Sequence, residues 1–443
     1  MKSRKQYCFT AITLLAALAI PVSLAADDEG DHHHKHNHYS LKTLETLGGT
    51  FGEAWGVSNN GLMAGHSTLL GDQVYHAFLW RKGVITDLGT LGGPNSNNSP
   101  TDPVNNRGAV TGFSDTSIPD PNGEDFCGFP TNLICLPFVW QNGVMIPLPL
   151  LGGNNGQAFK INNRGQIVGQ AEGPNPDPCS PFALEVSAVV WRNGQIERVL
   201  PPVGGSAAVA YAINDNGEAV GLAGCITGTV YAVLWRHSKP INLGSLGGIA
   251  GNIPFDINNR GQVVGQSDLP GDTNHHAFFW QDGVMTDLGS LPGLPTSVAN
   301  GINNKSQVVG FSQALNDPND VTPVAVLWEN GGMSDLNSLI HRGSLFLMEA
   351  LSINDRGQIA GFGRLPNGDH RGFLLTPCGD DDPGIDDCDY SEVEESDSAI
   401  RVDPSVAQNP TTASPWVVNP MMRFLGHRTM PWYRNLGVQP PSK

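Results

Sequence analysis

One turn motif recurs seven times along this chain, at intervals of roughly 50 residues. Its clearest copy reads Ile257-Asn258-Asn259-Arg260-Gly261, and the other copies begin at Val57, Val104, Ile161, Ile213, Ile302 and Ile353. The Gly of the motif adopts the left-handed conformation of a hairpin turn without steric cost. Internal repeats of this length are typical of propellers, solenoids and arrays. The repeat therefore constrains the fold more than any other feature of the sequence.

Each repeat carries a second turn signal and so divides into four short strands. In one unit these strands are expected at 253–257, 262–267, 276–280 and 285–289. The last two flank Asp282-Gly283, and Asn-Gly stands at the same place in other units, at Asn142, Asn193 and Asn330. Such dipeptides between apolar runs are strong hairpin signals. The sequence therefore predicts an all-β fold, a seven-bladed β-propeller of four-stranded antiparallel blades.

A tryptophan ends the third strand of six units. These residues are Trp80, Trp140, Trp191, Trp235, Trp280 and Trp328. They could be taken for an aromatic ligand cage. A residue at a fixed internal position of each unit is more typical of packing between adjacent blades, and that is the prediction here.

The last unit lacks a fourth strand, and the N-terminus supplies a match for it. Strands are expected at 348–353, 358–361 and 371–375, after which the chain runs into Pro377. The segment 43–49 (TLETLGG) matches the fourth strand and exit turn of the first unit, 87–93 (DLGTLGG), at five of seven positions. An N-terminal strand is thus predicted to close the last blade, which removes two exposed sheet edges.

The chain divides into four parts by composition. Residues 1–25 have a basic start, an apolar stretch and small residues at Ser23 and Ala25, as a signal peptide does. Residues 26–39 form a His-rich flexible leader, 40–377 the propeller, and 378–443 an acidic, then Pro-rich tail predicted to be mostly disordered. We expect a secreted protein, extracellular or periplasmic, with no membrane span.

Six cysteines remain after the signal peptide, an even number that favours disulfides in an exported chain. Their positions favour Cys127 with Cys135 inside one long loop. They also favour Cys179 with Cys225 in neighbouring repeats, and Cys378 with Cys388 beyond the last repeat.

The formal charge of −17 is concentrated in one segment. Ten carboxylates lie between Asp380 and Asp397, and such a block is usually a solvated tail. No basic stripe interleaved with aromatic residues occurs, so the sequence does not favour a nucleic-acid partner.

Candidate chemistry is sparse. The leader carries His32, His33, His34, His36 and His38, which could capture Zn, Ni or Cu. They lack the fixed spacing of a preformed site, so an unstructured leader is the competing interpretation. There is no nucleophile elbow, zinc-protease motif or phosphate loop. No unit carries an Asp or Glu that stands apart from the repeat, so no catalytic residue and no cofactor are predicted.

Several of these elements together resemble the HAF-repeat family of extracellular bacterial proteins. The resemblance rests on the Asn-Asn-Arg-Gly turns, the exit motif at 87–93, and the His-Ala-Phe elements at His76 and His276, and it covers residues 41–376. It implies location and architecture but no catalytic residue. In other units the His is replaced, for example by Leu136 and Ser187, so it is predicted to be dispensable to the blade.

The units differ most in the loop between their second and third strands. This loop is longest in the second unit, at 114–136, and in a propeller it shares a face with the Leu-Gly-Gly connections. The first hypothesis is a monomeric, non-enzymatic propeller that binds an extracellular protein or polysaccharide through this face. The alternative is a secreted carbohydrate-active hydrolase or lyase with acids at the channel mouth. A third hypothesis is metal capture by the His tract.

Overall fold

The computed structural model describes residues 39–378 apart from 99, 179, 226–228, 250, 315–321 and 342–343. These residues form seven antiparallel four-stranded sheets, the blades of a β-propeller. The signal peptide, the leader and the tail from 379 onward lie outside the described residues. The described part contains no helix long and apolar enough to cross a membrane.

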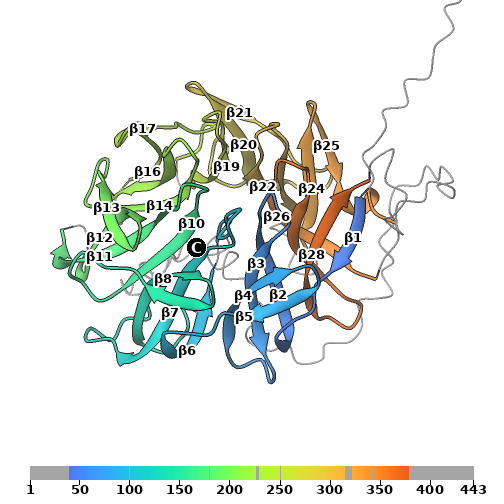
Figure 1. Cartoon of the computed structure of the whole chain (residues 1–443). Helices are drawn as coiled ribbons and strands as arrows, with labels where there is room; N and C mark the ends of the chain where they lie inside the picture. Colours follow the sequence, from blue (N-terminus) through green and yellow to red (C-terminus); the bar gives the residue numbers. More distant parts are fainter. Residues whose placement is uncertain are drawn as a thin grey trace, which may run out of the picture. The chain divides into compact units, whose positions relative to one another are not determined.

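Blades 1 to 6 each consist of four consecutive strands, a to d from the inside outward (Figure 1). Blade 1 is β2 (Gly48–Val57), β3 (Met63–Leu69), β4 (Tyr75–Arg81) and β5 (Val84–Asp87). Blade 2 is β6 (Gly92–Asn97), β7 (Val110–Pro119), β8 (Leu133–Gln141) and β9 (Val144–Pro147). Blade 3 is β10 (Gly156–Ile161), β11 (Gln166–Asp177), β12 (Ser180–Arg192) and β13 (Gln195–Leu200).

The remaining blades follow the same plan. Blade 4 is β14 (Ala207–Ile213), β15 (Ala219–Gly224), β16 (Val230–Arg236) and β17 (Lys239–Asn242). Blade 5 is β18 (Ile253–Ile257), β19 (Val263–Asp268), β20 (His275–Gln281) and β21 (Val284–Asp287). Blade 6 is β22 (Thr296–Ile302), β23 (Val308–Gln313), β24 (Val324–Glu329) and β25 (Gly332–Asp335), followed by the 3-10 turn η1 (Leu336–Ser338).

Blade 7 confirms the predicted closure by the N-terminus. Its strands are β26 (Phe346–Ile353), β27 (Ile359–Arg364), β28 (His370–Pro377) and, outermost, β1 (Tyr39–Thr43). β1 pairs antiparallel with β28, from Tyr39 opposite Pro377 to Thr43 opposite Phe373 (Figure 1). Both ends of the described chain are thus held in one sheet.

The two ends of the blades define two faces of the propeller. The a–b turns, which carry the Asn motif, and the c–d turns lie on one face, here called the turn face. The b–c loops and the d-to-a connections lie on the other, here called the loop face. Gly153 N–H donates to Glu172 O and Gly248 N–H to Asp268 O, so the Leu-Gly-Gly connections do contact the b–c end of their blade.

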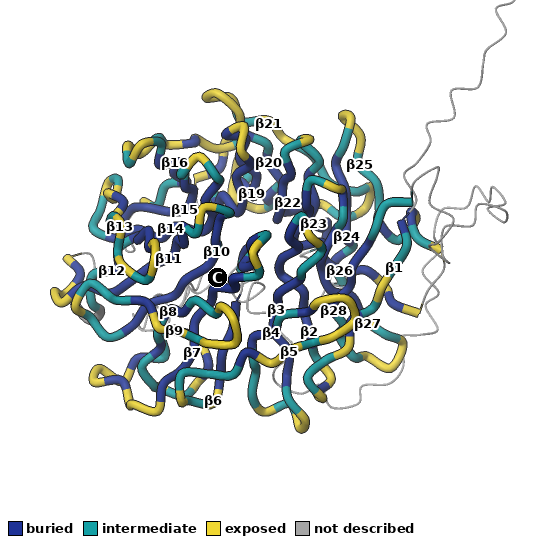
Figure 2. Tube along the Cα trace, in the orientation of Figure 1, coloured by how far each residue is buried: buried dark blue, intermediate teal, exposed yellow. Residues whose placement is uncertain are grey.

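The channel between the blades is filled. In six blades the inner strand bulges at the same place, for example between Ala158 and Lys160, and the extra residue is bulky in five of them. One buried apolar cluster contains residues of all seven blades, including Trp55, Phe159, Tyr211, Phe255 and Leu351. The buried inner strands are dark blue in Figure 2. The rings of Phe159 and Tyr211 are 5.7 Å apart, so this plug is continuous across neighbouring blades.

The tryptophans pack between blades, as predicted. Trp191 and Trp235 are at most 1% exposed, and their Nε1–H groups donate to Pro149 O and Pro201 O at 2.8 Å. Both carbonyls belong to the connection that precedes the tryptophan's own blade. The side chains therefore join neighbouring sheets rather than form a ligand cage, while Trp140 is half-buried.

Candidate functional site

The first Asn of the turn motif forms hydrogen bonds both within its own turn and to the next blade. In blade 5, Asn258 Oδ1 accepts from the N–H groups of Arg260 (3.0 Å) and Gln262 (3.1 Å). Its Nδ2 donates to Asn303 O of blade 6 at 2.9 Å. Equivalent links run from blade 2 round to blade 1, from Asn105, Asn162, Asn214, Asn303 and Asn354. Blade 1 has Ser58 here, which has no amide to donate.

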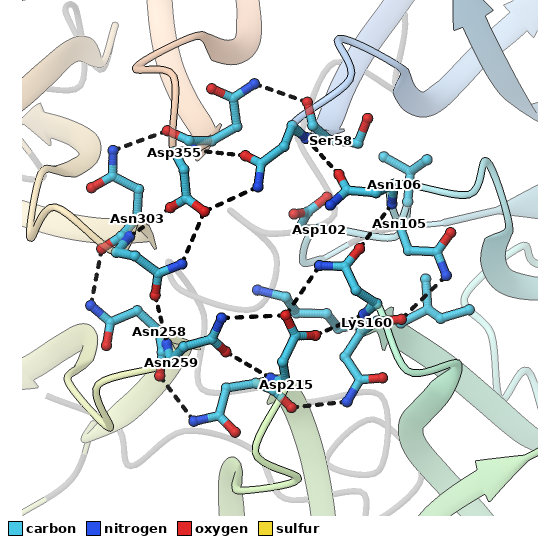
Figure 3. A pocket seen from close by; sticks show the side chains of 18 of the residues that line it. Ser58, Asp102, Asn105, Asn106, Lys160, Asp215, Asn258, Asn259, Asn303 and Asp355 are labelled. Carbon is cyan, nitrogen blue, oxygen red and sulfur yellow. Dashed lines mark hydrogen bonds between the residues drawn. The ribbon is translucent and has the colours of Figure 1, made fainter.

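The second residue of the motif forms a complete circuit. Its side-chain oxygen accepts from the backbone N–H of the same position in the preceding blade, at 2.8–3.0 Å in all seven blades (Figure 3). The position is Asp in blades 4 and 7. Asp355 Oδ2 accepts hydrogen bonds from the side-chain amides of both neighbouring turns, those of Asn304 and Asn59. Burial would raise the pKa of Asp355, but these hydrogen bonds and the charge of Lys305 hold it below its usual range.

A cavity of about 100 Å³ lies inside this ring of turns. Its wall consists of the turn residues together with Asp102 and Lys160 (Figure 3). Pockets for drug-sized ligands are roughly 300–1,000 Å³, whereas one water needs about 10–15 Å³. The cavity can therefore hold a few water molecules or a small ion, but not a sugar or a peptide.

Three charged residues stand inside the channel beside the cavity. Lys160 of β10 donates through Nζ to Asp256 of β18, and Asp102 of the segment before β7 lies close to both. Burial raises the pKa of Asp102 to about 7, while the charge of Lys160 lowers it and that of Asp256 raises it. Burial would lower the pKa of Lys160, but the facing carboxylates raise it above its ordinary value.

Carboxylates also converge on the loop face. Asn155, at the start of blade 3, donates through Nδ2 to Asp120 (2.8 Å), Glu124 (3.4 Å) and Glu172 (3.1 Å). All three acids are at most 7% exposed. Burial and the charge of Glu124 raise the pKa of Glu172 to about 8, and burial raises that of Glu124 as well. Since the two carboxyls hydrogen-bond to each other, one of them is protonated near neutral pH.

Asp120 and Glu124 belong to the long b–c loop of blade 2, residues 120–132. The predicted disulfide between Cys127 and Cys135 is present, with the two Cα atoms 6.1 Å apart. Phe129 of this loop packs on Phe113 with ring centroids at 5.7 Å, and so joins the apolar plug. The loop is therefore anchored over the channel by a covalent bond, an apolar contact and the acid–amide cluster.

A second polar pair is sealed in the wall of the channel. Glu53 and His66 are both 0% exposed, with Glu53 Oε2 accepting from Trp55 Nε1 at 3.0 Å. His66 Nε2 lies 3.7 Å from the same oxygen. Burial and the charge of Glu349 raise the pKa of Glu53 well above its usual value, and burial lowers the pKa of His66 to about 3. His66 is accordingly neutral at pH 7, and burial favours the neutral form of Glu53.

The His of the His-Ala-Phe element pairs with the Asp of the exit motif. Nδ1 of His76 lies 2.8 Å from Asp87 Oδ1, and Nδ1 of His276 lies 2.9 Å from Asp287 Oδ1. Asp87 Oδ1 also accepts from Gly89 N–H at 2.7 Å. The pair joins strands c and d near the blade edge, which is a local structural role.

Several of the other predicted site residues lie outside the part of the chain that the structure describes. His32, His33, His34, His36 and His38 fall outside the described residues, so metal capture stays a prediction. Cys225 and Cys378 are both disulfide-bonded, while Cys179 and Cys388 are outside the description. Within the described ranges, no group of three or more His, Cys, Asp or Glu side chains is placed to hold a metal ion.

The prediction that no acid stands apart from the repeat is wrong. The residue just before the turn's aliphatic is small or Pro in five blades, but it is Lys160 in blade 3 and Asp256 in blade 5. Four residues before the aliphatic stand Glu53 and Glu349, where four other blades have an aliphatic or Gln side chain and blade 2 has Pro100. Alignment of the inner strands on the Asn motif would have revealed both exceptions.

Comparisons with known proteins find distant structural neighbours. No protein-family model and no curated protein matches the chain, so the HAF resemblance stays a prediction. The β-propeller domain of the Trilobed protease from Pyrococcus furiosus is 7% identical, at TM-score 0.43, over 73% of this chain and 95% of that one. YCF48 bound to D1 peptide is 13% identical, at TM-score 0.38, over 78% of this chain and 97% of that one. The Aleuria aurantia lectin is 9% identical, at TM-score 0.29, over 74% of this chain and 93% of that one. Similarity at this level gives no information about the activity of this chain.

Proposed function

We propose that this chain is a secreted, non-enzymatic binding propeller that takes an extracellular protein or surface polymer on its loop face. The observation that supports the proposal is the difference between the two faces. On the turn face, the side chains of the repeated motif bond to one another, and the cavity inside them is small. The apolar plug fills the channel. The loop face carries the b–c loops and connections in which the blades differ, and the rigid sheets hold these segments in place.

Two of these features are strongly exposed apolar side chains. Leu70, in the b–c loop of blade 1, is 88% exposed, and Ile249, in the connection that enters blade 5, is 80% exposed. Both loops are held by carboxylates: Asp72 Oδ1 accepts from Thr50 N–H and Asp272 Oδ1 from Ile249 N–H, each at 2.7 Å. Apolar groups on fixed loops lose little entropy when a partner covers them.

The test is a binding screen of the mature protein against arrayed cell-envelope glycans and extracellular proteins, followed by two matched double variants. Leu70→Ser with Ile249→Ser alters the loop face. Val84→Ser with Val284→Ser alters two valines, 64% and 65% exposed, beside the c–d turns of the same two blades. Burial of one such side chain contributes about 1.5–3 kcal/mol, so the loop-face pair should weaken binding at least about tenfold. Equal effects of the two pairs would contradict the proposal.

Secretion rests on the first 25 residues. N-terminal sequencing of protein recovered outside the cytoplasm should begin at Ala26. Recovery of the intact N-terminus from the cytoplasm alone would contradict it.

A carbohydrate-active hydrolase or lyase is the second candidate, favoured by the proton-sharing pair of Glu124 and Glu172 on the loop face. A raised pKa suits a carboxyl to act as a general acid. If this function holds, the protein releases products from an arrayed glycan, and Glu172→Gln abolishes release while binding persists. Binding without any product favours the first proposal.

A further inference from the structure

Lys160 and Asp256 face each other across the channel from blades that are not neighbours. They occupy the same position in blades 3 and 5, and the corresponding residue of blade 4 between them is Ala212, which leaves room for the contact. Their side chains are 13% and 10% exposed. Nζ of Lys160 is in direct contact with Oδ1 of Asp256. An amine and a carboxyl are thus held against each other beside the apolar plug.

The carboxyl of Asp256 is held by backbone donors on both oxygens. Ile257 N–H donates to Oδ1 at 2.8 Å, and Ile302 N–H donates to Oδ2 at 3.1 Å. Fixed N–H donors of this kind polarise a carboxyl carbon and stabilise the negative charge that develops when a nucleophile adds to it. The carboxyl is therefore oriented and activated without further movement.

A third group is placed to move protons. Asp102 lies beside the pair, and its Oδ1 is buried without a hydrogen-bond partner. A carboxyl with a pKa of about 7 releases and accepts protons equally well at neutral pH. The facing carboxylates hold the proton on Lys160 Nζ, so a proton transfer within the Lys160–Asp256 contact must precede any addition of the amine.

We propose that Lys160 and Asp256 are joined by an intramolecular isopeptide bond, formed with Asp102 as the proton-transfer group. Nζ first passes a proton to Asp256 and becomes a neutral amine, whose lone pair adds to Cγ of the protonated carboxyl. Asp102 in its carboxylate form takes a proton from the nitrogen and returns it to the departing hydroxyl. The C–N bond forms, one C–O bond breaks, and one water leaves. No oxidant or external reactant is needed, and Asp102 ends as it began.

The bond ties blade 3 to blade 5 next to the cavity. It braces the ring from inside, as the pairing of β1 with β28 closes it from outside. The cavity offers the released water a place to go.

The experiment is mass spectrometry of the mature protein after reduction and alkylation. The expected intact mass is lower by one water than the mass calculated for the mature sequence with every cysteine alkylated. A tryptic digest should contain a branched peptide that joins the segments around 160 and 256, with no cleavage after Lys160. The full mass with an ordinary peptide ending at Lys160 would overturn the proposal. So would loss of water without a branched peptide, since that indicates succinimide formation between an Asp side chain and the next backbone nitrogen, for example at Asp282-Gly283.

Two variants separate the reactants from the proton-transfer group. Lys160→Arg keeps the positive charge but cannot form the amide, and should have the full mass. Asp102→Asn keeps both reactants, and should also retain the water or lose it far more slowly. Loss of water from Asp102→Asn at the wild-type rate would overturn the role of Asp102. The digest of the wild-type protein decides on the bond even if a variant does not fold.

Discussion

Replacement of Asn303 tests whether the Asn motif stabilises the ring or merely shapes a turn. Asn303 is 3% exposed, and its Oδ1 accepts from the N–H groups of Lys305 and Gln307 at 3.0 Å each. Its Nδ2 donates to Asn354 O of blade 7, also at 3.0 Å. Asn303→Ala leaves these three backbone groups without their partner. At about 1 kcal/mol for each bond, the free energy of unfolding should fall by about 3 kcal/mol.

Asn303→Ser separates the two roles, because blade 1 naturally carries Ser58 at this position. Ser58 Oγ accepts from Leu62 N–H at 3.1 Å, so a hydroxyl retains part of the turn but not the link between blades. We expect the Ser variant to lose about half as much stability as the Ala variant. Lys305→Ala, an exposed side chain of the same turn, is the control and should stay within about 0.5 kcal/mol of the wild type.

The assay is equilibrium unfolding in guanidinium chloride, monitored by tryptophan fluorescence, with calorimetry as a second probe of cooperativity. The order expected is wild type, then Lys305→Ala close to it, then Asn303→Ser, then Asn303→Ala. An Ala variant as stable as the Lys305 control would refute the reasoning. The reciprocal change, Ser58→Asn, should add about 1 kcal/mol by supplying an amide toward blade 2.

Three further predictions concern the closure, the disulfide and the loop-face acids. Deletion of residues 39–43 exposes the edge of β28 and should lower the melting temperature sharply or cause aggregation; unchanged melting would contradict the closure. Cys127→Ala should cost about 2–3 kcal/mol or less in unfolding experiments, and a variant as stable as the wild type would mean that the apolar and polar anchors suffice. Glu172 has its pKa raised from 4.5 to about 8, so the unfolded chain gives up that proton first and stability should fall as pH rises between these values. Glu172→Gln should flatten this slope, and an identical slope in both proteins would disprove the assignment.

The architecture could be predicted because the repeat encodes it locally. A turn such as Asn258–Gly261 specifies a hairpin by itself, and the match between 43–49 and 87–93 reveals which strand is missing. The bond of each first Asn to the next blade depends on ring closure, however. It appears only once seven copies of the turn are brought together.

The channel residues were missed for a related reason. Lys160 and Asp256 belong to blades 3 and 5, with blade 4 between them, and Asp102 lies on a segment that departs from the repeat. Their contact depends on the curvature of the ring and on the small side chain of Ala212. The convergence of Glu124 and Glu172 depends in the same way on the path of a long loop. Periodicity does not report contacts of this kind.

Hydrogen–deuterium exchange of the mature protein, with and without a glycan or protein ligand from the binding screen, tests the central claim most directly. If the loop face is the binding surface, the ligand should slow exchange in the loops at 70–74 and 120–132 and around Ile249. The turns at 58–61 and 303–306 should then exchange as in the free protein. Protection confined to those turns would contradict the account and move the binding site to the turn face.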